Sequence, residues 1–301
     1  MAVDVLILIF GSFAGACSIV FIKASTLNPI LLAAYRQLFA VVILAPVFIS
    51  AVKKSGRKLT FAMIKPSILP GVLLGLHFIA WNMGARRTLA ANGTLLVNMV
   101  PVVMPLFAFL FYREVVNLFE IIGTAVAMAG MVLLGITDFH TGRETFVGDM
   151  LCFVSMILAA VYLALGRRSY EGTGESLWIY IIPLYFTGGA VCFIVSLFFT
   201  GPGEKLTLFN ILMAGGLAAV STVGGHTIYN RSMRKLRSQL VTLVNLSQVI
   251  FGAILGFLFF NEMPSGMFYL AAPVILAGTV LAVVFSNRKR SGEIGGKSAG
   301  I

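Results

Sequence analysis

The stretch LFYREVVNLFEIIGTAVAMAG, residues 110–130, consists of an apolar run, a short polar elbow and a second apolar run. Much later, LFFNEMPSGMFYLAAPVILAG at residues 258–278 has Leu, Phe, Glu, Val, Ala and Gly at the same places. The two elbow glutamates, Glu114 and Glu262, are 148 residues apart, and so are the final glycines of the two stretches. An elbow written twice at one spacing indicates a chain built from two related halves.

The composition is that of a membrane protein. Of 301 residues, 59% are apolar and 11% are charged, and the mean hydropathy is +0.98, whereas a soluble domain is about 45–50% apolar. A spanning helix needs roughly 20 largely apolar residues, and turn-rich breaks divide this chain into such segments. We expect an all-α integral membrane protein with ten transmembrane helices, at residues 4–22, 29–52, 66–85, 92–111, 118–136, 147–166, 176–199, 209–230, 238–260 and 267–286.

The distribution of lysine and arginine predicts the orientation. With a cytoplasmic N-terminus, 16 of these residues fall in inner loops or the tail and 5 fall in outer loops, with Arg36 inside a span. By the positive-inside rule both termini are cytoplasmic, and the net charge of +11 reflects topology rather than nucleic-acid binding. The first segment follows Asp4 and no basic residue, so we expect it to be retained rather than cleaved as a signal peptide.

Further matches extend the repeat. WNMGARR at residues 81–87 aligns with YNRSMRK at residues 229–235, again 148 residues apart. Each half then holds five segments, and because five is odd the second half enters the membrane from the opposite side. We expect a first repeat at residues 1–145, an inverted second repeat at residues 146–287 and a basic cytoplasmic tail at residues 288–301. Inverted repeats are a recurring plan of secondary transporters, with substrate bound near the midplane between the halves.

Residues 4–286, with a glutamate at the fourth junction of each half and a glycine sixteen residues on, resemble the EamA-type transporters of the drug/metabolite transporter superfamily. The resemblance implies a secondary transporter in the cell inner (plasma) membrane that moves a small organic metabolite such as an amino acid, often outward, by alternating access. It also implies a central cavity surrounded by the first, third, fourth, sixth, eighth and ninth helices. No enzymatic activity is expected.

The elbow residues are interpreted as structural. Glu114 and Glu262 each come just before a helix N-terminus, where the helix dipole favours a carboxylate. Small residues allow close helix contact in membranes, which we expect at the elbow glycines and at glycine pairs such as Gly71 with Gly75.

Ionisable residues within the expected spans are few: Arg36, His77 and His226. Such groups are functional candidates because burying them is costly. His77 shares a helix face with Trp81, and His226 shares one with Tyr229, since residues three or four apart are neighbours on a helix. The histidines either line a pocket or bond a neighbouring helix. Arg36 is expected to reach the outer headgroups near the start of its span, with a direct role in substrate binding as the alternative.

The fourth segment of each half carries a second polar stripe. It includes Asn98, followed by Pro101 and Pro105, in the first half, and Asn245 with Gln248 in the second. A phenolic residue in the sixth segment completes a ring of candidates. The candidate substrate-binding residues are therefore His77, Trp81, Asn98, Tyr162, His226, Tyr229, Asn245 and Gln248.

The chemistry of this set favours a neutral, zwitterionic or mildly anionic organic solute, because no carboxylate lies at mid-depth of any segment. Membrane lipids are the other expected partners, without nucleic acid. No catalytic residue, cofactor or metal site is expected, since catalytic and phosphate-binding motifs are missing and the three cysteines form no C-x-x-C pair. Two alternatives remain, an intramembrane lipid enzyme with His77 or His226 as base, and a non-transporting scaffold or sensor.

Overall fold

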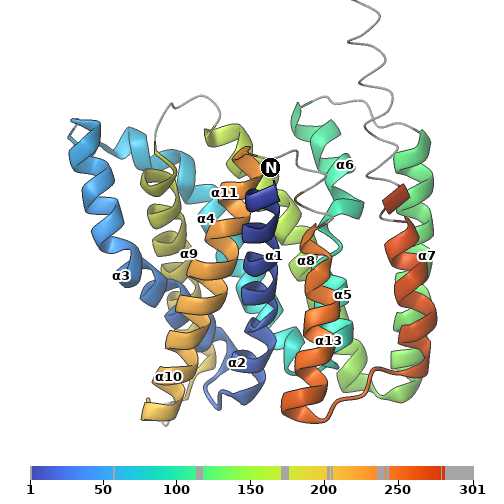
Figure 1. The fold of residues 1–301 in the computed structure, drawn as a ribbon. Helices are drawn as coiled ribbons and strands as arrows, with labels where there is room; N and C mark the ends of the chain where they lie inside the picture. The colour runs from blue at the N-terminus through green and yellow to red at the C-terminus, as the bar shows by residue number, and fades with distance from the viewer. Residues whose placement is uncertain are drawn as a thin grey trace, which may run out of the picture.

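The computed structural model is a bundle of helices (Figure 1). It describes residues 2–56, 58–112, 118–170, 176–201, 204, 206–235, 241, 244–278, 280 and 281, and no strand occurs among them. The helices are α1 (Ala2–Ala16), α2 (Ser18–Ala24), α3 (Pro29–Ser55), α4 (Phe61–Ala85), α5 (Ala90–Val97), α6 (Val100–Tyr112), α7 (Leu118–Thr141), α8 (Arg143–Tyr170), α9 (Leu177–Phe199), α10 (Leu208–Gly216), η1 (Leu217–His226), α11 (Thr227–Lys235) and α13 (Ser247–Phe260). A further apolar helix covers Gly266–Gly278.

Within the described residues, the helical stretches that correspond to the expected segments fall into a long group and a short group. Six are long and apolar enough to cross a membrane: Val3–Ala24, Pro29–Ser55, Phe61–Ala85, Arg143–Gly166, Leu177–Phe199 and Leu208–Ser232. The shorter apolar helices are Ala90–Met104, Ile121–Gly130, Ser247–Phe260 and Gly266–Gly278. The all-helical membrane class is confirmed, whereas the count of ten spans stays a prediction.

Large apolar side chains cover much of the outside of the bundle. Phe198, Leu208 and Val42 are 81%, 72% and 70% exposed, and many other Leu, Ile and Phe side chains share this property. A water-soluble surface rarely carries apolar patches of this extent. These faces suit contact with lipid chains.

Close helix packing depends on glycine, as expected from the sequence. A Cβ added to Gly75 on α4 would lie 2.7 Å from the carbonyl oxygen of Gly188 on α9. A Cβ added to Gly225 on η1 would lie 2.9 Å from the Cα of Gly15 on α1. The backbones therefore approach more closely than any larger residue permits, which brings the two halves of the chain together.

Two of the membrane segments are interrupted in the middle. The first divides into α1 and α2 at Cys17, and the fourth divides into α5 and α6 at Asn98 and Met99. The second break has a local cause, because Pro101 lacks the N–H that would bond the carbonyl of Val97. A proline in the first turn of the following helix costs nothing there, so α6 restarts directly after the break.

The eighth segment contains a π-helical stretch, η1, between α10 and α11. The hydroxyl of Thr222 donates to the carbonyl of Leu217 at 3.2 Å, and the hydroxyl of Thr227 donates to that of Thr222 at 3.2 Å. Both bonds reach back five residues, the spacing of a π-helix. Such wider turns often occur at functional sites, and η1 ends at His226.

A charge network joins distant segments at the end of the bundle where α2 ends and α5 begins (Figure 1). Lys23 forms an ion pair with Glu262 at 2.5 Å and donates to the carbonyl of Thr88 at 2.8 Å. Glu262 also accepts the backbone N–H of Ala90 at 2.7 Å. The hydroxyl of Thr88 donates to Asp149 on α8.

These contacts correct the expected role of one elbow glutamate. Glu262 stabilises the N-terminus of α5, not that of the helix that follows it in the chain. Near the start of Gly266–Gly278 the hydroxyl of Ser265 accepts the N–H of Phe268 at 3.2 Å instead. The other elbow glutamate, Glu114, lies outside the described residues.

We expect Glu262→Gln to lower the free energy of unfolding by about 1–3 kcal/mol, as loss of a partly buried charged hydrogen bond does. Thermal unfolding in detergent, followed with a thiol-reactive dye, measures the loss. Glu144→Gln is the matched control, because Glu144 is 83% exposed in its pair with Arg87 and exposed pairs contribute little. Equal effects of the two variants would contradict the assignment.

Candidate functional site

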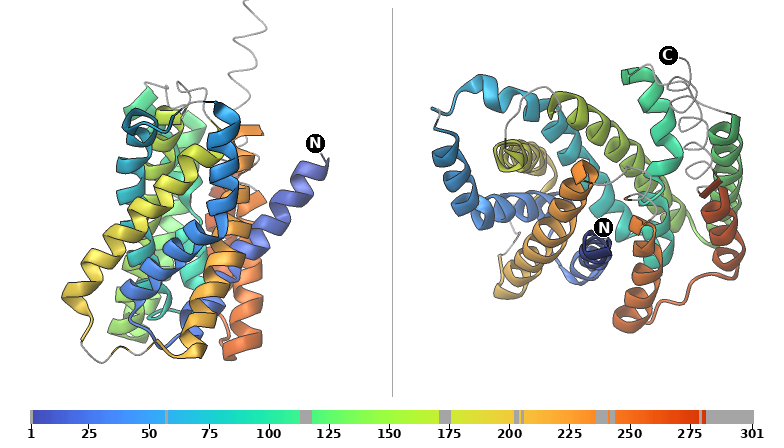
Figure 2. Two further views of the ribbon diagram at one scale, coloured as in Figure 1. Left: turned by 90° about the vertical axis from the view of Figure 1, so that its left-hand side faces the viewer. Right: turned by 45° about the horizontal axis from the view of Figure 1, so that its top comes forward.

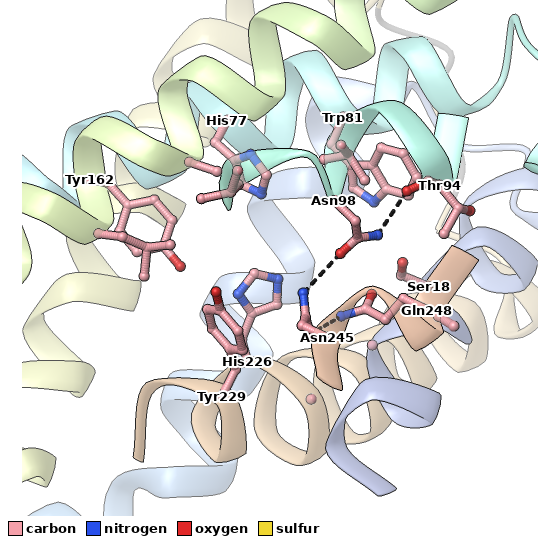
Figure 3. Close-up of a pocket in the computed structure, with 17 residues that line it drawn as sticks. Ser18, His77, Trp81, Thr94, Asn98, Tyr162, His226, Tyr229, Asn245 and Gln248 are labelled. Carbon is pink, nitrogen blue, oxygen red and sulfur yellow. Dashed lines mark hydrogen bonds between the residues drawn. The ribbon is translucent and has the colours of Figure 1, made fainter. Parts of the chain in front are cut away.

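A cavity that is partly open lies where the interrupted helices meet. Its walls come from α1, α2, α4, α5, α6, α8, η1, α11 and α13 (Figure 3). Every residue nominated from the sequence lines it: His77, Trp81, Asn98, Tyr162, His226, Tyr229, Asn245 and Gln248. Residues that are far apart in the chain are thus brought to one place. Their role in binding stays a prediction.

One wall is formed by α4 and α8. His77 and Trp81 lie one turn apart on α4, and Tyr162 faces them from α8 with its ring centroid 6.1 Å from that of His77. The hydroxyl of Ser155 donates to the carbonyl of His77 at 3.0 Å, and His77 Nδ1 lies 2.9 Å from the carbonyl oxygen of Ser155. The hydroxyl oxygen of Ser155 also lies 2.8 Å from His77 Nδ1, so both polar groups of Ser155 hold the imidazole against α8.

The opposite wall is formed by η1 and α11, with His226 and Tyr229 (Figure 3). The ring centroids of His226 and His77 are 6.2 Å apart in an edge-to-face arrangement, so the two walls meet at the two histidines. Among the described residues, His226 Nδ1 has no hydrogen-bond partner although it is buried. The sequence left two interpretations of the histidines open, and the geometry shows both features in His77: it lines the cavity and bonds a neighbouring helix.

The third wall is a chain of amides that crosses between the halves (Figure 3). Gln248 donates to Asn245, Asn245 donates to Asn98 at 2.9 Å, and Asn98 donates to the backbone carbonyl of Thr94 at 2.8 Å. These hydrogen-bonded amides therefore connect α13 to α5, and Asn98 bonds a backbone carbonyl close to the break after Val97. The amides offer further donors and acceptors to a solute.

Small residues at the helix breaks also line the cavity, and the candidate set from the sequence did not include them. Gly15, Ala16 and Ser18 flank the interruption at Cys17, and Gly225 lies in η1. The adjacent small residues Gly15 and Ala16 are the sequence feature that could have indicated this part of the cavity. Small residues serve helix packing equally often, however. Two residues on the same helix faces as the polar stripes are not covered by this description. Thr242, three residues before Asn245, lies outside the described residues, and the side chain of Pro105 is not described.

The expectation for Arg36 is wrong. Its side chain does not reach headgroups, since the residue is only 1% exposed. Nε donates to the hydroxyl of Thr222 at 3.2 Å, and Cζ lies 3.8 Å above the ring centroid of Phe78. The position of Arg36 near the start of α3 suggested a surface role, but the inward face of α3 directs the side chain to η1 and α4.

The cavity offers aromatic faces, amides, hydroxyls and imidazoles, and none of the described residues that line it is a carboxylate. Within the described residues, no group of three His, Cys, Asp or Glu residues could hold a metal ion. Stacking and hydrogen bonding of an organic molecule are the interactions that this lining supports.

Comparisons with known proteins agree with this picture. The profile of the EamA-like transporter family matches two consecutive parts of the chain, residues 2–136 and 146–284. "Uncharacterized transporter YyaM" of Bacillus subtilis (strain 168) is 26% identical over 225 residues, which are 70% of each chain. "Solute carrier family 35 member G1" of Mus musculus is 23% identical over 212 residues, 65% of this chain and 55% of the mouse protein. The chain thus spans about half the length of the mouse relative.

A solved crystal structure has the same fold, with a TM-score of 0.63 over 95% of this chain and 99% of the other at 17% identity. The family profile covers nearly all of the chain in two parts, and six of the described helical stretches are apolar and long enough to cross a membrane. The chain therefore belongs to the EamA-like transporter family.

Proposed function

We propose that the protein is a secondary carrier that binds a small organic metabolite, such as an amino acid, in the central cavity and exports it. The observation that carries the proposal is the convergence of polar and aromatic side chains from both family-matched parts on one cavity. His77, Trp81 and Asn98 come from the first part, and Tyr162, His226, Tyr229, Asn245 and Gln248 come from the second. Outward direction rests on the family resemblance.

The proposed architecture is two inverted five-helix repeats, residues 1–145 and 146–287, followed by a basic tail at residues 288–301. The double match of the family profile supports it, as does the pairing of their last helices. A Cβ added to Gly278 would lie 2.6 Å from the carbonyl oxygen of Gly123, so α7 and Gly266–Gly278 pack side by side (Figure 2). In this scheme the four shorter apolar helices also cross the membrane.

Alternating access is the proposed mechanism. The network of Lys23, Glu262 and Thr88 links distant segments at one end of the bundle, and opening of that end would require these contacts to separate. The amide chain from Gln248 to Asn98 joins the halves at the cavity, where a bound solute could take over its hydrogen bonds. Exchange of protein–protein for protein–solute bonds would let binding loosen one arrangement and stabilise another.

Uptake of a panel of labelled metabolites into proteoliposomes tests the function. A carrier moves one solute class in a saturable manner and returns it chemically unchanged by mass spectrometry. Chemical conversion of a lipid or solute would favour the alternative of an intramembrane enzyme. Absence of any movement in folded, correctly inserted protein would favour a scaffold or sensor.

The orientation can be tested with single cysteines in a background lacking Cys17, Cys152 and Cys192. Because the positive-inside rule predicts cytoplasmic termini in the plasma membrane, cysteines replacing Lys54 and Ser298 should be shielded from an impermeant thiol reagent in intact cells. A cysteine replacing Thr141 should be labelled. The opposite pattern would overturn the proposed topology.

Substitution of Trp81 tests the cavity as the binding site. Trp81→Leu removes the aromatic face but keeps apolar volume, which matters because Trp81 is only 5% exposed and packs in the core. We expect binding of the transported solute to weaken by about 1–3 kcal/mol, as for loss of a buried aromatic anchor. Equilibrium binding to purified protein measures it.

Trp178→Leu is the matched control, since Trp178 packs on the same core but does not line the cavity. Affinity unchanged in both variants would place the binding site elsewhere.

A further inference from the structure

Arg36 is a buried cation without a counterion among the described residues. It is 1% exposed, Nη1 is buried with no hydrogen-bond partner, and no described carboxylate lies within ion-pair distance of it. Only Nε is bonded, to the neutral hydroxyl of Thr222. Burying a charge is costly unless it is paired and fully hydrogen-bonded. The described residues therefore compensate this charge only in part.

The surroundings of Arg36 add no negative charge. Phe78 covers one face of the guanidinium, and Gln37 beside it in the chain bonds the carbonyl of Ala33 and the sulfur of Cys192. Tyr185 is fully buried and bonds the hydroxyl of Thr227. These side chains are neutral, so the positive potential of Arg36 is not cancelled locally.

Arg36 lies one side chain behind the cavity wall. The ring of Phe78, on which it stacks, has its centroid 4.9 Å from that of His77 and 5.0 Å from that of His226, and both histidines line the cavity. Its partner Thr222 lies four residues before His226 on η1. In a medium of low dielectric constant a charge acts strongly across one such layer. A second buried nitrogen without a partner, His226 Nδ1, lies in the same region.

We propose that the transported solute bears a net negative charge, carried by a carboxylate, and that Arg36 is the residue that makes the cavity select it. The proposal rests on the proposed function and adds the charge class of the substrate. The anionic group lies on the side of His77 and His226, and the apolar part packs on Trp81 (Figure 3). Arg36 acts through the wall as a fixed countercharge, and its own contacts need not change on binding.

Selectivity between an acid and its amide tests this inference. Trp178→Phe leaves Trp81 as the sole tryptophan, so its fluorescence reports occupancy of the cavity. Titration with 3-phenylpropionate and with its neutral analogue 3-phenylpropionamide gives the two dissociation constants. We expect the acid to bind at least tenfold more tightly than the amide. Arg36→Gln should bring the ratio near one, and Arg36→Lys should retain a preference for the acid.

If Arg36 has only a structural role, its substitution will weaken the binding of both probes equally. The ratio of their dissociation constants would then stay unchanged, and this result would overturn the proposal. If Arg36→Gln does not fold, the ratio of the two dissociation constants in the parent protein and in Arg36→Lys still tests the preference for the acid. A ratio near one in the parent, a preference for the amide, or no saturable binding of the acid contradicts it.

Failure of this inference is distinguishable from failure of the transport function. Saturable uptake of neutral or cationic solutes alone, with no preference for the acid, would support the carrier function and contradict the anionic substrate. Tight, Arg36-dependent binding of the acid without uptake into proteoliposomes would support the anion-selective site and contradict the carrier function.

Discussion

The bilayer core contains no water to satisfy backbone groups, so every interruption of a membrane helix must be satisfied by side chains or must face a cavity. Pro101 removes the N–H that the carbonyl of Val97 needs and thereby forces a break at Asn98. The side chain of Asn98 then bonds the carbonyl of Thr94 and accepts from Asn245. The break in this helix, the bond to the second half and the wall of the cavity thus meet at Asn98.

The same constraint explains why the other irregular stretches converge on the cavity. The interruption at Cys17 and the π-helical η1 both contribute to its lining, through Gly15 and Ser18 on one side and His226 on the other. Glycine allows this convergence, because Gly15 and Gly225 bring two backbones into contact. Regular helices elsewhere, such as α3 and α9, supply the rigid frame.

Charge is used sparingly and in two different ways. At one end of the bundle Lys23 and Glu262 compensate each other and also bond backbone groups of Thr88 and Ala90. In the interior Arg36 has a hydroxyl and an aromatic face instead of a carboxylate. The first arrangement stabilises a contact between segments, whereas the second leaves a potential that a bound solute can compensate. This difference separates a structural ion pair from a candidate determinant of specificity.

The sequence by itself determined the membrane class, the positions of the long helices and eight of the residues that line the cavity, because apolar length and helical periodicity are local properties. His77 with Trp81, and Asn98 with its prolines, could be read from spacing alone. Tertiary structure decided which helix Glu262 stabilises, where Arg36 points and that two amides from different halves bond each other. Those outcomes depend on which helix faces which, and side-chain direction across a contact is fixed only when the helices pack.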